Sequence, residues 1–95
     1  MSQRRAVVTG GATGIGRACA IELARGGDHV FVLNRDALKS AVVVEEIRQA
    51  GGRADALPAD ITDQASLRNA FDTVGRCDVL INSAGAASNM PFEQV

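Results

Sequence analysis

Short apolar runs alternate with longer segments of helical spacing along the whole chain. The apolar runs lie at 6–8, 29–33, 54–57 and 79–81, and polar residues, proline or glycine bound each of them. Short runs that are apolar throughout are typical of strands buried on both faces of a sheet. Asp55 interrupts the run at 54–57, and Pro58 after it cannot donate a backbone hydrogen bond. We therefore expect this strand at an edge of the sheet.

Helical spacing of apolar residues fills the gaps between these runs, from about 15 to 25, 37 to 50 and 65 to 74. Glycines follow each segment directly and are expected to end the helices. Asp36 is suited to cap the second helix, and either Thr62 or Asp63 the third. The apolar positions predicted to lie on one side of the second helix are Leu38, Ala41, Val42 and Ile47.

This alternation predicts the α/β class, with a Rossmann-type doubly wound parallel sheet. Right-handed crossovers place the first four strands in the order 3-2-1-4, which is an incomplete sheet of this type. A further helix is predicted to start near Pro91. Ligands of such sheets bind outside the carboxyl ends of the strands, so the residues that follow each strand are the ones to examine.

Composition excludes several classes of partner. The 95 residues carry ten basic and eleven acidic side chains, a net charge of −1 at pH 7, and no cluster of Lys and Arg. We therefore expect no nucleic-acid partner. The longest unbroken apolar stretch falls far short of the roughly 20 residues that span a bilayer, so we also expect no membrane partner and a cytoplasmic location.

Few side chains suit catalysis. Cys19 and Cys77 have neither CxxC spacing nor a neighbouring His cluster, which predicts two buried thiols and no metal site. His29 is the only histidine, and we interpret it as a turn or surface residue. The sequence has no tyrosine and no tryptophan.

The first strand leads into the glycine-rich segment Thr9-Gly10-Gly11-Ala12-Thr13-Gly14-Ile15-Gly16. Glycines at such a turn let the backbone approach a pyrophosphate, whose charge is met by amides at the helix N-terminus. The spacing is Thr-Gly-x-x-x-Gly-x-Gly rather than Gly-x-Gly-x-x-Gly. A glycine-rich loop alone is equally typical of an ordinary turn, but its place between a strand and an amphipathic helix favours a nucleotide.

The end of the second strand bears on which dinucleotide would bind. An acidic residue about 20 positions beyond the glycines is typical of NAD sites, because it accepts the ribose 2′-hydroxyl. This chain has Asn34 there, followed by Arg35. A guanidinium can hold a 2′-phosphate, and Asn34 lacks the carboxylate that would repel it. These residues favour NADP over NAD, although an Arg in this place can also be a solvated loop cation.

Three segments together resemble the short-chain dehydrogenase/reductase family: the glycine-rich turn, then Asp60-Ile61, then Asn82-Ser83-Ala84-Gly85. Their order and spacing match over essentially the whole chain. The resemblance implies that Thr13 reaches phosphate or ribose and that Ile15 lies along the pyrophosphate. It also implies that Asp60 and Ile61 frame the adenine, although Asp60 could instead cap the next helix.

The same resemblance implies structural and cofactor-binding roles for the segment Asn82-Ser83-Ala84-Gly85. Asn82 would tie the central strands together, and Ala84 and Gly85 would lie against the cofactor ribose. The residues predicted to bind the cofactor are therefore Gly10, Thr13, Gly14, Ile15, Gly16, Asn34, Arg35, Asp60, Ile61, Asn82, Ala84 and Gly85.

The chain departs from the family pattern at several points. Ser83 replaces the second Asn of Asn-Asn-Ala-Gly, and Thr13 stands where many NADP-preferring members carry a basic residue. The segment from Asp60 to Asn82 is about one helical turn shorter than is usual in the family. The family's catalytic Ser and Tyr-x-x-x-Lys belong beyond Val95, so no catalytic residue is assigned.

These observations predict an NADP(H)-dependent oxidoreductase acting on a small-molecule carbonyl or alcohol, with residues 1–95 as the N-terminal dinucleotide-binding part of a single Rossmann domain. The full-length enzyme is expected to be a homo-oligomer, and the 95-residue chain alone to be inactive. The alternative is a non-catalytic dinucleotide-binding sensor or regulatory module. The glycine spacing disfavours the related epimerases and dehydratases.

Overall fold

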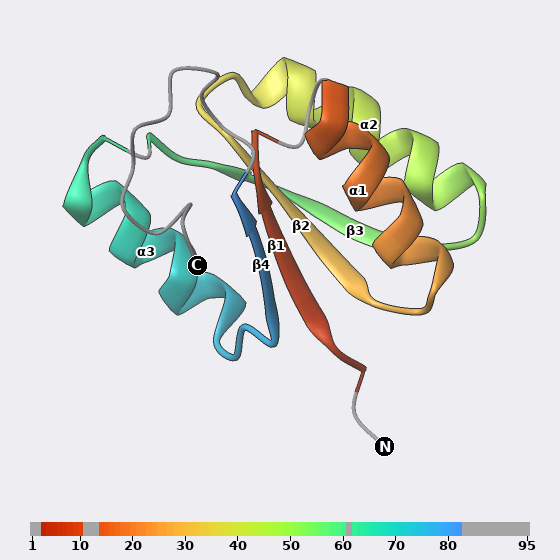
Figure 1. Ribbon diagram of the computed structural model, residues 1–95. Coiled ribbons are helices and arrows are strands. Elements are labelled where there is room, and N and C mark those ends of the chain that lie inside the picture. Colours follow the sequence, from red (N-terminus) through yellow and green to blue (C-terminus); the bar gives the residue numbers. More distant parts are fainter. Residues whose placement is uncertain (1–2, 11–13, 61, 83–95) are drawn as a thin grey trace.

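Strands and helices alternate through the described part of the chain. The computed structural model describes residues 3–10, 14–60 and 62–82. Its elements are, in chain order, β1 (Arg5–Thr9), α1 (Gly14–Arg25), β2 (His29–Asn34), α2 (Ala37–Gln49), β3 (Arg53–Pro58), α3 (Gln64–Val74) and β4 (Val79–Asn82). The strands pair in parallel in the order β3-β2-β1-β4 (Figure 1). The predicted α/β class and strand order are confirmed, and the helix expected near Pro91 lies outside the described residues.

Helices cover the sheet on both faces. Helices α1 and α2 lie on one face, and α3 lies on the other (Figure 1). Successive strand residues point to opposite faces, so each strand contributes to two separate cores. The core beneath α1 and α2 contains Ala6, Val8, Val30, Val32, Ala54, Ala20, Ala24, Val43, Val44 and Ile47. The core beneath α3 contains Val7, Phe31, Leu33, Leu57, Ala59, Ala70 and Val74.

Acidic caps start two of the helices. The Asp36 carboxylate accepts the backbone N–H groups of Leu38 and Lys39 at the start of α2. The Asp63 carboxylate does the same for the first turn of α3, so Asp63 rather than Thr62 is the cap. Such caps satisfy amides that have no partner within the helix.

The buried side of α2 differs from the predicted one. Ser40, Val43, Val44 and Ile47 are buried, whereas Leu38 is 80% exposed and Val42 is 62% exposed. Positions 40, 43, 44 and 47 follow the i, i+3, i+4, i+7 spacing of a single helix face. The prediction was right for Ile47 only, because α2 has apolar residues on two sides and Leu38, Ala41 and Val42 lie on the exposed one.

Two predictions about single side chains were also wrong. Neither cysteine is the buried thiol that was predicted: Cys77 is exposed in the short link between α3 and β4, and Cys19 on α1 is only partly buried. His29 begins β2, as the run at 29–33 predicted, but it is not the turn or surface residue that we had inferred, since its side chain is only 12% exposed. Its Nε2 lies 2.7 Å from Oδ2 of Asp55 on the neighbouring strand, and its ring stacks on Phe31.

Membrane-spanning helices and metal-binding clusters are both absent from the described part of the chain. No helix there is long and apolar enough to cross a membrane. Within the same residues, no group of His, Cys, Asp and Glu side chains is arranged to hold a metal ion.

Candidate functional site

The carboxyl ends of the strands bring most of the predicted cofactor residues to one edge of the sheet. Gly10 follows β1, Asn34 ends β2 and Asn82 ends β4. Asp60 lies two residues beyond the end of β3, which pairs with β2. The predicted contacts Thr13, Ile61, Ala84 and Gly85 lie outside the described residues.

The turn after β1 depends on glycine geometry. Gly10 has φ 65° and Gly14 has φ 58°, values in the left-handed region that side chains with a Cβ rarely adopt. The Gly10 N–H donates to the Leu33 carbonyl at 3.0 Å, so the first residue of the turn is fixed to β2. Gly16 is buried, whereas Ile15 is 78% exposed beside it. The turn therefore leaves an open surface at the start of α1.

The first turn of α1 differs electrostatically from those of the other two helices. None of residues 10–13 before it is acidic, and the guanidinium of Arg17 within it is paired with Glu46 of α2. The corresponding ends of α2 and α3 each have an Asp carboxylate bound to their amides. The partial positive charge of a helix N-terminus favours a bound anion. The α1 end therefore has the charge that a pyrophosphate requires.

Thr9 is a site residue that the sequence interpretation did not select. Its side chain is buried at the end of β1, and Oγ1 lies 2.7 Å from Asn82 Oδ1 at the end of β4. The hydroxyl can donate to this amide oxygen and so hold Asn82 against β1. The signal in the sequence is a β-branched residue with a hydroxyl group directly before the first glycine of the turn.

Replacing Thr9 with Val should remove this bond while keeping the side-chain shape. We expect the free energy of unfolding to fall by about 1 kcal/mol, the usual net contribution of such a bond. Urea unfolding followed by circular dichroism measures the change. The matched control is Thr73→Val, because Thr73 is exposed on α3 and its hydroxyl donates only within the helix. Equal losses in the two variants would contradict the role given to Thr9.

A guanidinium and a carboxylate meet beyond the ends of β2 and β3. Arg35 NH1 lies 3.9 Å from Asp60 Oδ2, and the two side chains are 81% and 35% exposed. This single long contact on an exposed side chain leaves the guanidinium accessible to a ligand. Asn34 does not add a negative charge here, and its Oδ1 accepts the Asp36 N–H at 2.8 Å.

Asp60 is held mainly by Thr62 rather than by Arg35. Its Oδ1 accepts the Thr62 hydroxyl at 2.6 Å and the Thr62 N–H at 2.9 Å. The hydroxyl and then the N–H of Thr62 lower the pKa of the Asp60 carboxyl, and the charge of Arg35 contributes a smaller lowering. Asp60 is therefore ionised at neutral pH, with one oxygen fixed in its own loop.

Comparison with known proteins agrees with this arrangement. A family model described as short chain dehydrogenase matches residues 4–95. The uncharacterized oxidoreductase UxuB of Bacillus subtilis (strain 168) is 45% identical over 89 residues, which cover 90% of this chain and 32% of UxuB. The chain thus spans about a third of the length of that relative.

Solved structures are similar as well. A hydroxysteroid dehydrogenase from Escherichia coli matches with a TM-score of 0.80 and 36% identity, over 95% of this chain and 42% of that one. A metagenomic short-chain oxidoreductase solved in complex with NADP matches with a TM-score of 0.76 and 37% identity, over 84% of this chain and 38% of that one. The fold, the glycine turn and these matches agree, and the chain belongs to the short-chain dehydrogenase/reductase family.

Proposed function

We propose that residues 1–95 form the N-terminal, dinucleotide-binding part of a single Rossmann domain in an NADP(H)-dependent oxidoreductase. The proposal is supported chiefly by the exposed Arg35 guanidinium, which lies beside a neutral Asn34 at the carboxyl edge of the sheet. The bound cofactor would supply or accept the hydride that interconverts a small-molecule carbonyl and alcohol. Family membership supports this reaction class.

The residues around the β1–α1 turn suit the pyrophosphate of a dinucleotide. Gly10 and Gly14 keep the backbone free of side chains, and an added Cβ at Gly14 would meet no atom within 4 Å. The first amides of α1 would face the phosphate charge, and Ile15 would lie along it. We also propose that Thr13, Ile61, Ala84 and Gly85 complete the binding surface, as the resemblance implies.

The choice of NADP rests on charge at the end of β2. A 2′-phosphate placed there would meet the Arg35 guanidinium, which can bind two phosphate oxygens. Asn34 would neither repel the phosphate nor accept a 2′-hydroxyl as strongly as a carboxylate would. The ionised Asp60 opposes phosphate binding, but Thr62 satisfies one of its oxygens. The NADP complex of the metagenomic relative supports the same choice.

Cofactor titration tests the proposal. We expect NADPH to bind more tightly than NADH, and Arg35→Ala to weaken NADPH binding about tenfold while leaving NADH binding nearly unchanged. Tenfold is the lower end of the range for a charge-assisted contact, because Arg35 is mostly exposed. Quenching or transfer of nicotinamide fluorescence gives both affinities.

Arg68→Ala is the matched control, since it removes the same charge from an exposed position on α3. The control should leave both affinities within about twofold of the original chain. Equal or tighter binding of NADH, or an Arg35→Ala variant that binds NADPH normally, would contradict the assignment.

A further inference from the structure

A cavity lies at the edge of the sheet opposite the proposed cofactor site. Its volume is about 490 Å³, and it is bounded by the amino ends of β1, β2 and β3 and by the last turn of α3. Its charged and ionisable lining residues are Arg5, His29, Arg53 and Arg76, and apolar surface comes from Phe31 and Val74. No carboxylate belongs to the lining among the described residues.

Three of the basic residues form one row across the sheet. Arg5 on β1 pairs with His29 on β2, which pairs with Arg53 on β3. Directly paired residues of parallel strands point to the same face, and so do residues two positions apart on one strand. Val7 and Phe31, two positions beyond Arg5 and His29, pack in the core beneath α3, so the basic row also lies on the α3 face. Helix α3 covers the apolar row and ends at Val74, and Arg5 and Arg53 remain exposed.

Arg5 and Arg53 place two positive charges in this row, one on each side of His29. Two carboxylates near the cavity offset part of this charge. Asp55 lies 2.7 Å from His29 Nε2 and also accepts the Arg48 guanidinium at 2.8 Å. Asp78 accepts the Arg5 backbone N–H at 2.8 Å and the Arg76 Nε at 3.1 Å. Both acids are thus already engaged, and neither lines the cavity.

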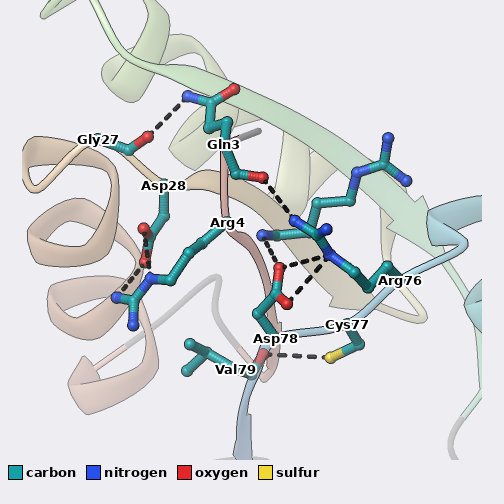
Figure 2. Close-up of polar contacts among 9 residues, drawn as sticks. Gln3, Arg4, Gly27, Asp28, Arg76, Cys77, Asp78 and Val79 are labelled. Atoms are coloured by element: carbon teal, nitrogen blue, oxygen red, sulfur yellow. Dashed lines mark hydrogen bonds and ion pairs between the residues drawn. The ribbon is translucent and has the colours of Figure 1, made fainter. Parts of the chain in front are cut away.

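The arginines are held by contacts that leave donors available. The Arg5 guanidinium donates to the Val74 carbonyl and so connects β1 to the end of α3. The Arg53 guanidinium donates from NH1 to Gln3 Oε1 at 2.8 Å. Figure 2 shows Arg76 between Asp78 and the Gln3 backbone, whose carbonyl accepts Arg76 NH2 at 3.3 Å. Each guanidinium has five N–H donors, so Arg5 and Arg53 can both bind a further anion.

We propose that this cavity binds a small organic anion with at least two acidic groups, either carboxylates or phosphates. Arginine forks match the oxygen geometry of both groups. The apolar surface of Phe31 and Val74 favours an organic body rather than a bare inorganic ion, and the volume lies in the range of small-molecule sites. The site is separate from the proposed dinucleotide site, because the two lie at opposite ends of β2.

Isothermal titration of the protein with citrate and, separately, with fructose 1,6-bisphosphate tests the proposal at constant ionic strength. We expect at least one probe to bind, and Arg53→Ala to weaken that binding about fivefold or more, which corresponds to the upper end of exposed charge pairs. Arg53→Lys should lose less affinity, since it keeps the charge. The two probes distinguish a carboxylate ligand from a phosphate ligand.

Two control variants make the result specific. Arg68→Ala removes an exposed charge that does not line the cavity, and Arg25→Ala removes one from the end of α1, on the other face of the sheet. Both should leave the probe affinity within about twofold. Failure of both probes to bind at millimolar concentration would overturn the proposal. It would also be overturned if Arg68→Ala or Arg25→Ala weakened binding as much as Arg53→Ala. Since cofactor affinity is measured separately, failure here leaves the proposed function untouched.

Discussion

The 95-residue chain is expected to bind NADPH but to show no substrate-dependent oxidation of it. Reduction of a carbonyl needs a positioned proton donor beside the nicotinamide, and the family's donor is a tyrosine assisted by a lysine. This chain has no tyrosine, and its only lysine, Lys39, is exposed in the first turn of α2. A positioned donor typically contributes about 10² to 10⁴ in rate, so the rate should fall below that of a complete relative by at least this factor.

Two candidate donors within the described residues, His29 and Cys77, lie at the edge of the sheet opposite the proposed cofactor site. His29 begins β2, whereas the proposed cofactor site is at the other end of that strand. At about 3.3 Å per residue, the two ends of β2 are about 16 Å apart, which is too far for proton transfer to a bound carbonyl. Cys77 lies just before β4, at the same amino edge as His29.

The measurement is the loss of NADPH absorbance in the presence of a panel of small ketones and aldehydes. The E. coli hydroxysteroid dehydrogenase, purified in the same way and assayed with its own substrate, is the positive control. Oxidation that depends on substrate and survives further purification would show that a donor within this chain has been overlooked. Such a result would place the chemistry elsewhere than the resemblance implies.

The strand order and the helix boundaries could be predicted because local signals agreed with one another. Strands β1 and β2 are apolar on both faces, as expected for strands with helices above and below them. Glycine after each helix and Asp36 or Asp63 before two of them marked the ends within a residue or two. Pro58 at the end of the third strand correctly indicated an edge.

The errors came from contacts between elements, which no local pattern records. Ser40 is fully buried beside Val43, Val44 and Ile47 on the covered side of α2, whereas the apolar Leu38 and Val42 are exposed, so apolar spacing alone did not identify that side. His29 is covered because β3 places Asp55 next to it and Phe31 lies beneath its ring. The basic row of Arg5, His29 and Arg53 likewise exists only through the strand register. These residues are 24 positions apart in sequence in each pair, so only the register brings them together.

The site residues that could be predicted are those that end a strand or directly follow one. Asn34 and Asn82 were selected because they end strands, and the structure places them at the same edge as Gly10 and Asp60. Thr9 was missed because its hydroxyl contacts Asn82 and the Ile81 carbonyl, on a strand more than 70 positions later in the chain. The hydrogen bond from the Thr62 hydroxyl to the Asp60 carboxylate was also not predicted, because the Asp-x-Thr spacing is common in loops and does not by itself indicate a contact.

The free edge of β4 is expected to make the 95-residue chain self-associate. Within the described residues, β4 pairs only with β1, and Leu80 on its α3-facing side is 52% exposed. An edge strand with unpaired backbone groups and an apolar side chain favours pairing with a second copy. A longer protein that carried the strands following β4 in relatives would cover this edge, and we expect it to be more soluble and to melt at a higher temperature.

Leu80→Lys tests the role of this edge without changing chain length. Natural edge strands use lysine to block pairing, and burial of a leucine contributes about 1.5 to 3 kcal/mol, so the self-association constant should fall roughly ten- to a hundredfold. Sedimentation velocity over a range of concentrations measures the constant. Leu38→Lys is the matched control, because Leu38 is 80% exposed on α2, away from the edge.

Equal weakening of self-association by Leu80→Lys and Leu38→Lys would point to non-specific apolar contact. A wild-type chain that stays monomeric and melts cooperatively at high concentration would instead show that β4 needs no cover, and that these residues form a self-sufficient domain.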